Sequence, residues 1–356
     1  MNVETDMRYA AAACQVDLPN PIDRDGIAAH VDHMLDRIDQ VVSGYRPFEP
    51  VRLIVFPEFA HAAPIYPTVA ELREKLAVEL PNAHTDRYVA KAREHDVYIQ
   101  TGTFLERHPD HPEAVFNSTC LIGPAGVLSI YRKVNPWIPW EVHASPHDLA
   151  NFDAPIFPVV DTPIGRLGAA ICYDWLFPEV LRQLVADGAE ILLRVSAYMD
   201  PWGATPPMDW WTVVNRCRAL ENIAYVVAAN QAASQSHYPP FSWPGGSMVV
   251  DYDGRILAQA DPGPGAKTVV APIDLGALRH ARATRRGHQP MAHLRSELYP
   301  LYRRSQYPPA TGGAPTITDL DRRIARSQAR LGYRAPTDGG IDGDGDARDD
   351  GDGPRA

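Results

Sequence analysis

One stretch of the chain, residues 166–179 (RLGAAICYDWLFPE), restricts the fold more than any other. Residues 166–171 are mostly small or apolar, which is typical of a buried strand, and Cys172 follows at once. A helix is expected to open near Pro178. Open α/β sheets place their ligands at such strand ends, and the helix N-terminus beyond favours a thiolate. The pattern predicts a nucleophile at Cys172, although this stretch alone leaves open a small buried packing cysteine.

The rest of the chain alternates apolar strands with amphipathic helices, and hairpins interrupt the alternation. An apolar strand that ends in polar residues occurs in each half, at 51–58 and 190–198, so we expect two mixed sheets stacked face to face with helices outside. Strands are expected over 7–16, 51–56, 97–106, 115–122, 127–131, 159–171 (a hairpin), 190–195, 224–229, 247–252, 255–260 and 268–273. Helices are expected over 26–42, 68–94 (two, split by Pro81), 177–187, 208–221, 275–283 and 317–331.

Composition divides the chain into a body and a tail. Residues 1–283 are expected to form one catalytic domain, 284–335 a C-terminal arm with a helix, and 336–356 a disordered acidic tail. The formal net charge is −10, and the tail carries seven Asp against two Arg. An acidic body argues against a nucleic-acid partner.

Several classes of protein are disfavoured by what the sequence lacks. The four cysteines are widely spaced without a CxxC pair, which excludes a disulfide scaffold or a zinc ribbon. His143 and His147 have the spacing of a helical metal pair, but Pro146 argues against a helix there, so no metal is expected. Phosphate-binding glycine motifs are absent and no cofactor is expected. Without a signal peptide or a long apolar segment, we expect a cytoplasmic protein with no membrane partner.

Three polar residues follow predicted strands directly: Glu58, Lys133 and Cys172. Strand ends of one sheet system converge on one cleft, and the three side chains are chemically complementary. A thiol needs a neighbouring base to become nucleophilic, and a carboxylate can be that base. An ammonium can hold the carboxylate and stabilise a tetrahedral intermediate. The trio predicts covalent catalysis without a histidine.

The same residues lie in segments that resemble the nitrilase superfamily of carbon–nitrogen hydrolases: FPE at 56–58, YRK at 131–133 and ICYDWLFPE at 171–179. The resemblance covers roughly residues 8–275. It implies a four-layer αββα sandwich of two mixed sheets, which dimerises. It also implies that Cys172 is the nucleophile, Glu58 the general base and Lys133 the oxyanion-side stabiliser.

Residues 132–141 (RKVNPWIPWE) resemble a run of the aliphatic amidases and formamidases, which implies a second glutamate at Glu141. Cys172-Tyr173-Asp174 resembles the amidase and carbamoylase branches. The segment after Glu141 and the residues after Cys172 differ from those of aliphatic amidases, which leaves the substrate open. Phe59, Trp137 and Tyr198 are expected to line an apolar substrate pocket, with packing in the core as the alternative for each. Tyr173 is expected to bind the substrate through its backbone N–H, which would face the oxyanion.

The sequence therefore predicts an amidohydrolase that converts a small amide to a carboxylate and ammonia through a Cys172 thioester. The alternatives are a nitrilase, an N-carbamoyl amine or amino-acid hydrolase and, from another class, a catalytically inactive member that binds a partner. The expected partners are a small amide, carbamoyl or nitrile substrate and further copies of the chain, in a homodimer or higher oligomer.

Overall fold

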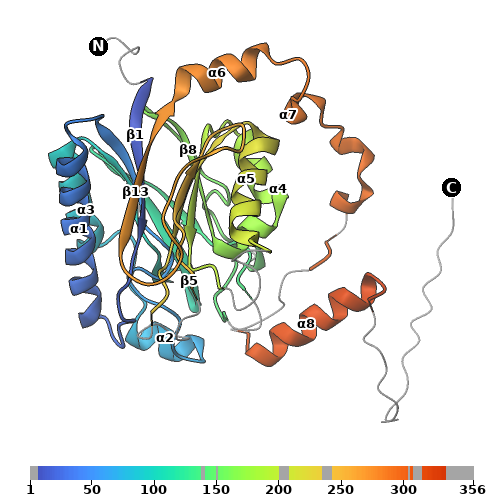
Figure 1. Cartoon of the computed structure of the whole chain (residues 1–356). Helices are drawn as coiled ribbons and strands as arrows, with labels where there is room; N and C mark the ends of the chain where they lie inside the picture. Colours follow the sequence, from blue (N-terminus) through green and yellow to red (C-terminus); the bar gives the residue numbers. More distant parts are fainter. Residues whose placement is uncertain are drawn as a thin grey trace, which may run out of the picture.

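The protein is a four-layer αββα sandwich, seen in a computed structural model (Figure 1). The structure describes residues 7–137, 141–149, 151–199, 208–234, 243–303, 305–307 and 315–333. Two stacked mixed sheets lie at the centre, with α1 (Asp25–Tyr45) and α3 (Ala83–His95) on one side and α4 (Pro178–Ala186) and α5 (Trp210–Asn222) on the other. The expected fold class is confirmed. The predicted tail, 336–356, lies outside the described residues.

The first sheet has seven strands, six of them in the order β13-β1-β2-β3-β5-β4, and β6 pairs antiparallel with Ser118–Gly123 of β5. Strand β1 lies between β13, to which it is antiparallel, and β2, to which it is parallel. The strands are β1 (Arg8–Gln15), β2 (Val51–Val55), β3 (Tyr98–Gln100), β4 (Phe104–His108), β5 (His111–Gly123), β6 (Gly126–Arg132) and β13 (Lys267–Asp274).

The second sheet has six strands in the order β12-β11-β10-β9-β8-β7. Its centre is parallel, because β8, β9 and β10 run the same way, and hairpins add the two edges. The strands are β7 (Val159–Thr162), β8 (Gly165–Ile171), β9 (Ile191–Ser196), β10 (Tyr225–Asn230), β11 (Met248–Val250) and β12 (Ile256–Gln259).

The alanine-rich strand β1 shows how the layers pack. Side chains alternate across a strand, so Tyr9, Ala11 and Ala13 pack toward the second sheet. Ala10 and Ala12 pack instead with residues of α1 and α3. All five side chains are fully buried because both faces of the sheet are covered. The sequence of β1 is therefore apolar along the strand and does not alternate with polar residues.

The expected single strand over 97–106 is wrong, because the chain breaks between β3 and β4. Gly102 lies there against the loop that follows β2: a Cβ on Gly102 would stand 2.3 Å from Ala60 Cβ and 2.5 Å from Pro57 O. The hydroxyl of Thr103 accepts a hydrogen bond from Phe59 N at 2.9 Å. The break therefore brings Gly102 and Thr103 against the loop that carries Glu58 and supports that loop.

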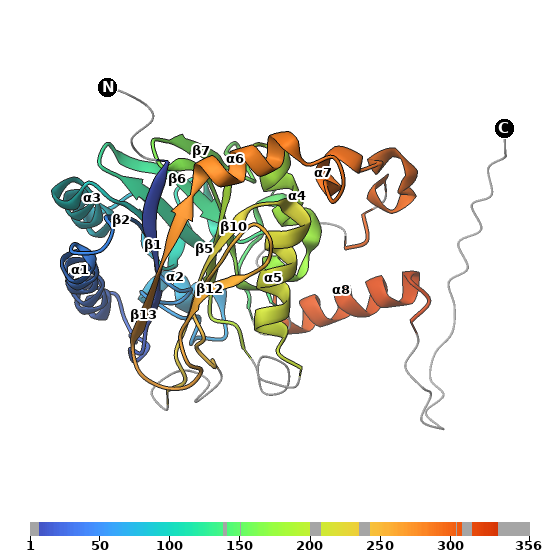
Figure 2. The same cartoon turned by 45° about the horizontal axis from the view of Figure 1, so that its top comes forward.

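The remaining helices lie outside this frame. Helix α2 (Val69–Lys75) covers β4 and β5 near the loop after β2, and α6 (Leu275–Thr284) follows β13. Beyond it, α7 (Pro290–His293) packs against α5, and Met291 of α7 accepts a hydrogen bond from Arg182 of α4. Helix α8 (Ile317–Arg330) lies further along this C-terminal arm (Figure 2). Among the described residues, no helix has the length and apolar character needed to cross a membrane.

Candidate active site

Three loops at strand ends carry the residues expected to form the site. Glu58 follows β2, Lys133 follows β6 and Cys172 follows β8. The backbone turns sharply at the first and third of these points, because Phe59 has φ of 59° and Cys172 has φ of 45°. Such a conformation is uncommon for residues with a Cβ and is concentrated at functional sites. At Cys172 it turns the chain from β8 directly into the 3₁₀ turn Cys172–Leu176.

Glu58 is completely buried and both of its carboxylate oxygens are hydrogen-bonded. Oε1 accepts from Lys133 Nζ and from Asn117 Nδ2, each at 2.8 Å. Oε2 accepts from the backbone N–H of Ala197, just beyond β9, also at 2.8 Å. The sequence does not predict this role for Asn117, because a single asparagine in an apolar strand belongs to no recognisable motif. The carboxylate is therefore fixed from both sheets.

Lys133 lies between two carboxylates. Its Nζ donates to Glu58 at 2.8 Å and to the two oxygens of Glu141 at 2.9 and 2.8 Å. Glu141 Oε2 also accepts from the backbone N–H of Trp137 at 2.6 Å. Burial by itself lowers the pKa of Lys133, but Glu141 and Glu58 outweigh it and raise the pKa overall. The ammonium stays charged and holds both acids.

Cys172 is buried, and its thiol interacts electrostatically with Glu58, Lys133 and Glu141. Burial raises the pKa of the thiol, and the Glu58 carboxylate raises it further, against the opposing effects of Lys133 and Ser196. The resting thiol is therefore protonated at neutral pH. The thiolate that a helix N-terminus was expected to favour is not the resting state, because α4 begins only at Pro178 and burial dominates.

Asp174 joins the turn at Cys172 to the segment after Lys133. One oxygen accepts from Tyr131 Oη at 2.7 Å and Ile171 N at 3.1 Å, and the other from Asn135 N at 2.8 Å and Asn135 Nδ2 at 3.0 Å. Burial raises the pKa of its carboxyl to about 6. No motif in the sequence predicts this role for Asp174; the available signal is a carboxylate that directly follows a predicted buried strand.

The expected aromatic residues lie in three different settings. Phe59 packs against Trp243 with ring centroids 6.0 Å apart, and Tyr173 packs against Phe177 at 5.2 Å. Tyr198 is buried and lies against Trp211 at 5.9 Å. Trp137 is half-buried and contacts the cluster through its backbone. The backbone of Trp137 thus contacts the Glu58–Lys133–Glu141 cluster directly, and a common pocket lined by these aromatic residues stays a prediction.

The pair of histidines considered as metal ligands is divided between the interior and the surface. His143 is buried beside the cluster, whereas His147 is exposed. The segment between them includes the short 3₁₀ turn Pro146–Asp148. The two rings therefore occupy different environments.

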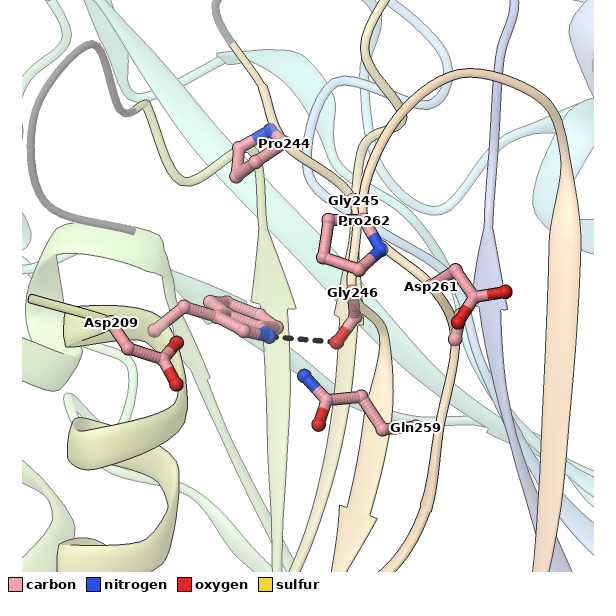
Figure 3. Close-up of a pocket in the computed structure, with 9 residues that line it drawn as sticks. Asp209, Pro244, Gly245, Gly246, Gln259, Asp261 and Pro262 are labelled. Carbon is pink, nitrogen blue, oxygen red and sulfur yellow. Dashed lines mark hydrogen bonds between the residues drawn. The ribbon is translucent and has the colours of Figure 1, made fainter. Parts of the chain in front are cut away.

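A cavity of about 280 Å³ lies at the start of α5 (Figure 3). Trp211 lines this cavity, and its indole donates a hydrogen bond from Nε1 to Gly246 O at 2.8 Å. Its lining includes Asp209, Gly245, Gln259 and Asp261. None of Glu58, Lys133, Glu141 and Cys172 lines this cavity, so we do not assign it to the chemistry.

The fold and the side-chain cluster together define a class of protein: an αββα sandwich with a buried cysteine beside a lysine that bridges two glutamates. Such a set of groups is suited to attack on an electrophilic carbon. Comparison with known proteins identifies the family. Residues 10–283 match the model of the family described as carbon-nitrogen hydrolase, and the chain belongs to this family. The resemblance to the nitrilase superfamily drawn from the three motifs is thereby confirmed.

Curated and structural relatives agree with this assignment. A protein named formamidase, from Bacillus cereus, is 32% identical over 260 residues, which cover 72% of this chain and 71% of the relative. A carbon-nitrogen hydrolase from Helicobacter pylori has a TM-score of 0.66 at 19% identity, covering 84% of this chain and 99% of the other. An amidase from Nesterenkonia sp. has a TM-score of 0.60 at 22% identity, covering 83% and 96%.

Proposed function

We propose that this enzyme hydrolyses a small amide to a carboxylate and ammonia through a thioester on Cys172. The observation that carries the proposal is the buried Glu58–Lys133–Glu141 cluster, linked by hydrogen bonds of 2.8–2.9 Å, together with the buried Cys172 at the end of β8. The formamidase relative supports an amide as the substrate class. The raised pKa of the thiol is the reason that a base is required.

The first half of the reaction forms the thioester. Glu58 takes the thiol proton as the Cys172 sulfur bonds to the carbonyl carbon. The oxyanion that develops is stabilised by the Lys133 charge and by the backbone N–H of Tyr173. Glu58 then gives its proton to the nitrogen, the C–N bond breaks and ammonia leaves. Three carboxylate contacts occupy the three N–H donors of Lys133, so direct contact with the oxyanion requires one Glu141 bond to open.

The second half of the reaction hydrolyses the thioester. Water loses a proton to Glu58 and bonds to the acyl carbon, the S–C bond breaks, and the proton returns to the sulfur. Glu141 assists by holding Lys133 in place, and Lys133 in turn holds Glu58, the base, in position. The carboxylic acid product leaves and the site returns to its resting protonation.

Substrate turnover by variants tests this proposal. The wild-type enzyme is expected to release ammonia from formamide or another small amide, whereas Cys172→Ala is expected to lose turnover while keeping its circular dichroism spectrum and melting temperature. Amidase activity retained by folded Cys172→Ala would contradict the proposal. Cys217→Ala, at an exposed cysteine on α5, is the matched control and should leave turnover unchanged.

Product analysis separates the alternative functions. A nitrilase would convert a nitrile faster than the matching amide, and a carbamoyl hydrolase would release carbon dioxide. A catalytically inactive member would show no turnover and no selective alkylation of Cys172. Fluoroacetamide, which adds covalently at the active-site cysteine of a variant of the Nesterenkonia amidase, is a suitable reagent for that last test.

We also propose that the chain forms a homodimer. Trp210, Val213 and Leu220 of α5 are 48–57% exposed, and the arm exposes Leu298 and Leu301 by 61% and 52%. Apolar side chains gathered on a helix and an arm in this way are typical of an interface between subunits.

A cytoplasmic location stays a prediction from the sequence, which cell fractionation would test.

A further inference from the structure

The side chain of His143 points toward the candidate active site because of the alternation of its segment. Residues 141–145 have no regular secondary structure, and Ala144 N donates to Val115 O of β5 at 2.8 Å. Val142 packs away from the site, in an apolar cluster with Leu105 and Val115. Glu141 and His143 flank Val142 and lie together on the other side, with His143 Nδ1 4.0 Å from Glu141 Oε2.

Both ring nitrogens of His143 lack a hydrogen-bond partner among the residues that the structure describes. The side chain is 0% exposed, so bulk water does not satisfy these nitrogens. The 4.0 Å separation from Glu141 is too long for a hydrogen bond. A buried polar group without a partner is rare in native proteins, because it loses its contacts with water and gains none in return.

The imidazole of His143 is neutral, since burial, aided by Lys133 and opposed by Glu58, lowers its pKa to about 3. A neutral imidazole offers one N–H donor and one acceptor nitrogen. The polar groups around it are already engaged with one another: Glu58 and Glu141 both accept from Lys133, and each also accepts from a backbone N–H. His143 therefore adds unused hydrogen-bonding capacity to this cluster.

We propose that His143 is a specificity-determining residue that hydrogen-bonds an uncharged polar group of the substrate next to the scissile carbonyl, such as the hydroxyl of a 2-hydroxy amide. This inference rests on the proposed amide hydrolysis. A hydroxyl both donates and accepts, which matches the neutral ring. A carboxylate at this position is disfavoured, because the ring carries no charge and the neighbouring cluster has more carboxylates than ammonium groups.

Glycolamide and propionamide provide the test, because they differ by a hydroxyl in place of a methyl group at nearly constant size. The wild-type enzyme is expected to have a higher kcat/KM for glycolamide. His143→Phe is expected to reduce the ratio of the two kcat/KM values by about 10- to 100-fold, which is typical when a buried hydrogen bond is lost. His143→Asn, which keeps a donor and an acceptor, is expected to restore part of the ratio. His147→Phe, at the exposed histidine of the same segment, is the control and should leave it unchanged.

The melting temperature separates recognition from a structural role. Because His143 makes no described hydrogen bond, His143→Phe should keep or raise the melting temperature while the ratio falls. A ratio unchanged in folded His143→Phe would overturn the inference and leave the proposed function intact. Hydroxylamine can replace water in the attack on the thioester. If His143→Phe changed the proportion of hydroxamate to acid product but left the ratio of the two kcat/KM values unchanged, the inference would also be overturned, because His143 would then position water. If the wild-type enzyme hydrolysed neither amide, nor formamide, the proposed function itself would fail.

Discussion

The carboxyl of Asp174 ties the backbone turn at Cys172 to the strand end at Lys133. It accepts four hydrogen bonds, from Tyr131, Ile171 and Asn135, and it is completely buried. Its position fixes the relative placement of the thiol and the ammonium without contact to either. We regard Asp174 as a positioning residue, whose contribution is measurable through stability.

Asp174 makes stability depend on pH with a defined sign. Its pKa is about 6 in the folded protein, against about 4 for an ordinary Asp, so the native state binds more protons between these pH values. The free energy of unfolding that it contributes therefore falls as pH rises from about 4 through about 6. Asp174→Asn removes this dependence, so urea unfolding should show the wild type losing on the order of 2 kcal/mol relative to the variant over that range.

Asp161→Asn, at an exposed carboxyl on β7, is the control for this experiment. Its free energy of unfolding should change with pH as that of the wild type does, apart from a small constant difference. Parallel profiles for wild type and Asp174→Asn would show that Asp174 titrates alike in both states and would refute the assigned cause.

Among secondary-structure elements, the break between β3 and β4 positions Glu58 most directly. A methyl group on Gly102 would overlap Ala60 Cβ and Pro57 O, on both sides of Glu58 in the sequence. We expect Gly102→Ala to shift this loop, to lower kcat/KM by at least about tenfold, and to destabilise the fold by about 1–3 kcal/mol, as overpacking does. Steady-state kinetics and urea unfolding measure the two effects.

Gly44→Ala is the matched control for Gly102→Ala. It lies in α1 with no atom near the added methyl group, so activity should be unchanged and stability equal or higher. Full activity in Gly102→Ala would show that the loop tolerates the shift, and the assigned role of the break would be wrong.

The same loop shows which elements the sequence predicts and which it does not. The long helix α1 is predicted well because its apolar spacing reflects one buried face, and the short strand β2 because it is an apolar run that is almost entirely buried. The break at Thr101-Gly102-Thr103 was missed because its cause is a tertiary contact with residues 57–60. In the candidate site, strand-end positions predicted the Glu58–Lys133 contact. The roles of Asn117 and Asp174 depend on partners far along the chain that no local pattern reveals.

At the scale of the whole molecule, one chain leaves apolar side chains exposed on α5 and on the arm. If this surface joins two copies, Val213→Glu with Leu220→Glu should shift the protein from dimer toward monomer in sedimentation equilibrium. Two buried carboxylates facing an apolar partner cost far more than the hydrophobic contact they replace. Phe48→Glu, at a side chain 79% exposed on the opposite side of the sandwich, is the control and should leave the mass unchanged. A monomeric wild-type protein at all concentrations would contradict the dimer.

The central claim, that Cys172 carries the acyl group during amide hydrolysis, is tested most directly by trapping the thioester. Enzyme mixed with an amide substrate is quenched in acid within its first turnovers, digested and mapped by mass spectrometry. We predict one acyl group on the peptide that contains Cys172, absent from Cys172→Ala and lost over time if the unquenched mixture exhausts its substrate. Steady ammonia release with no acyl group on Cys172, or with the acyl group on another residue, would contradict the mechanism.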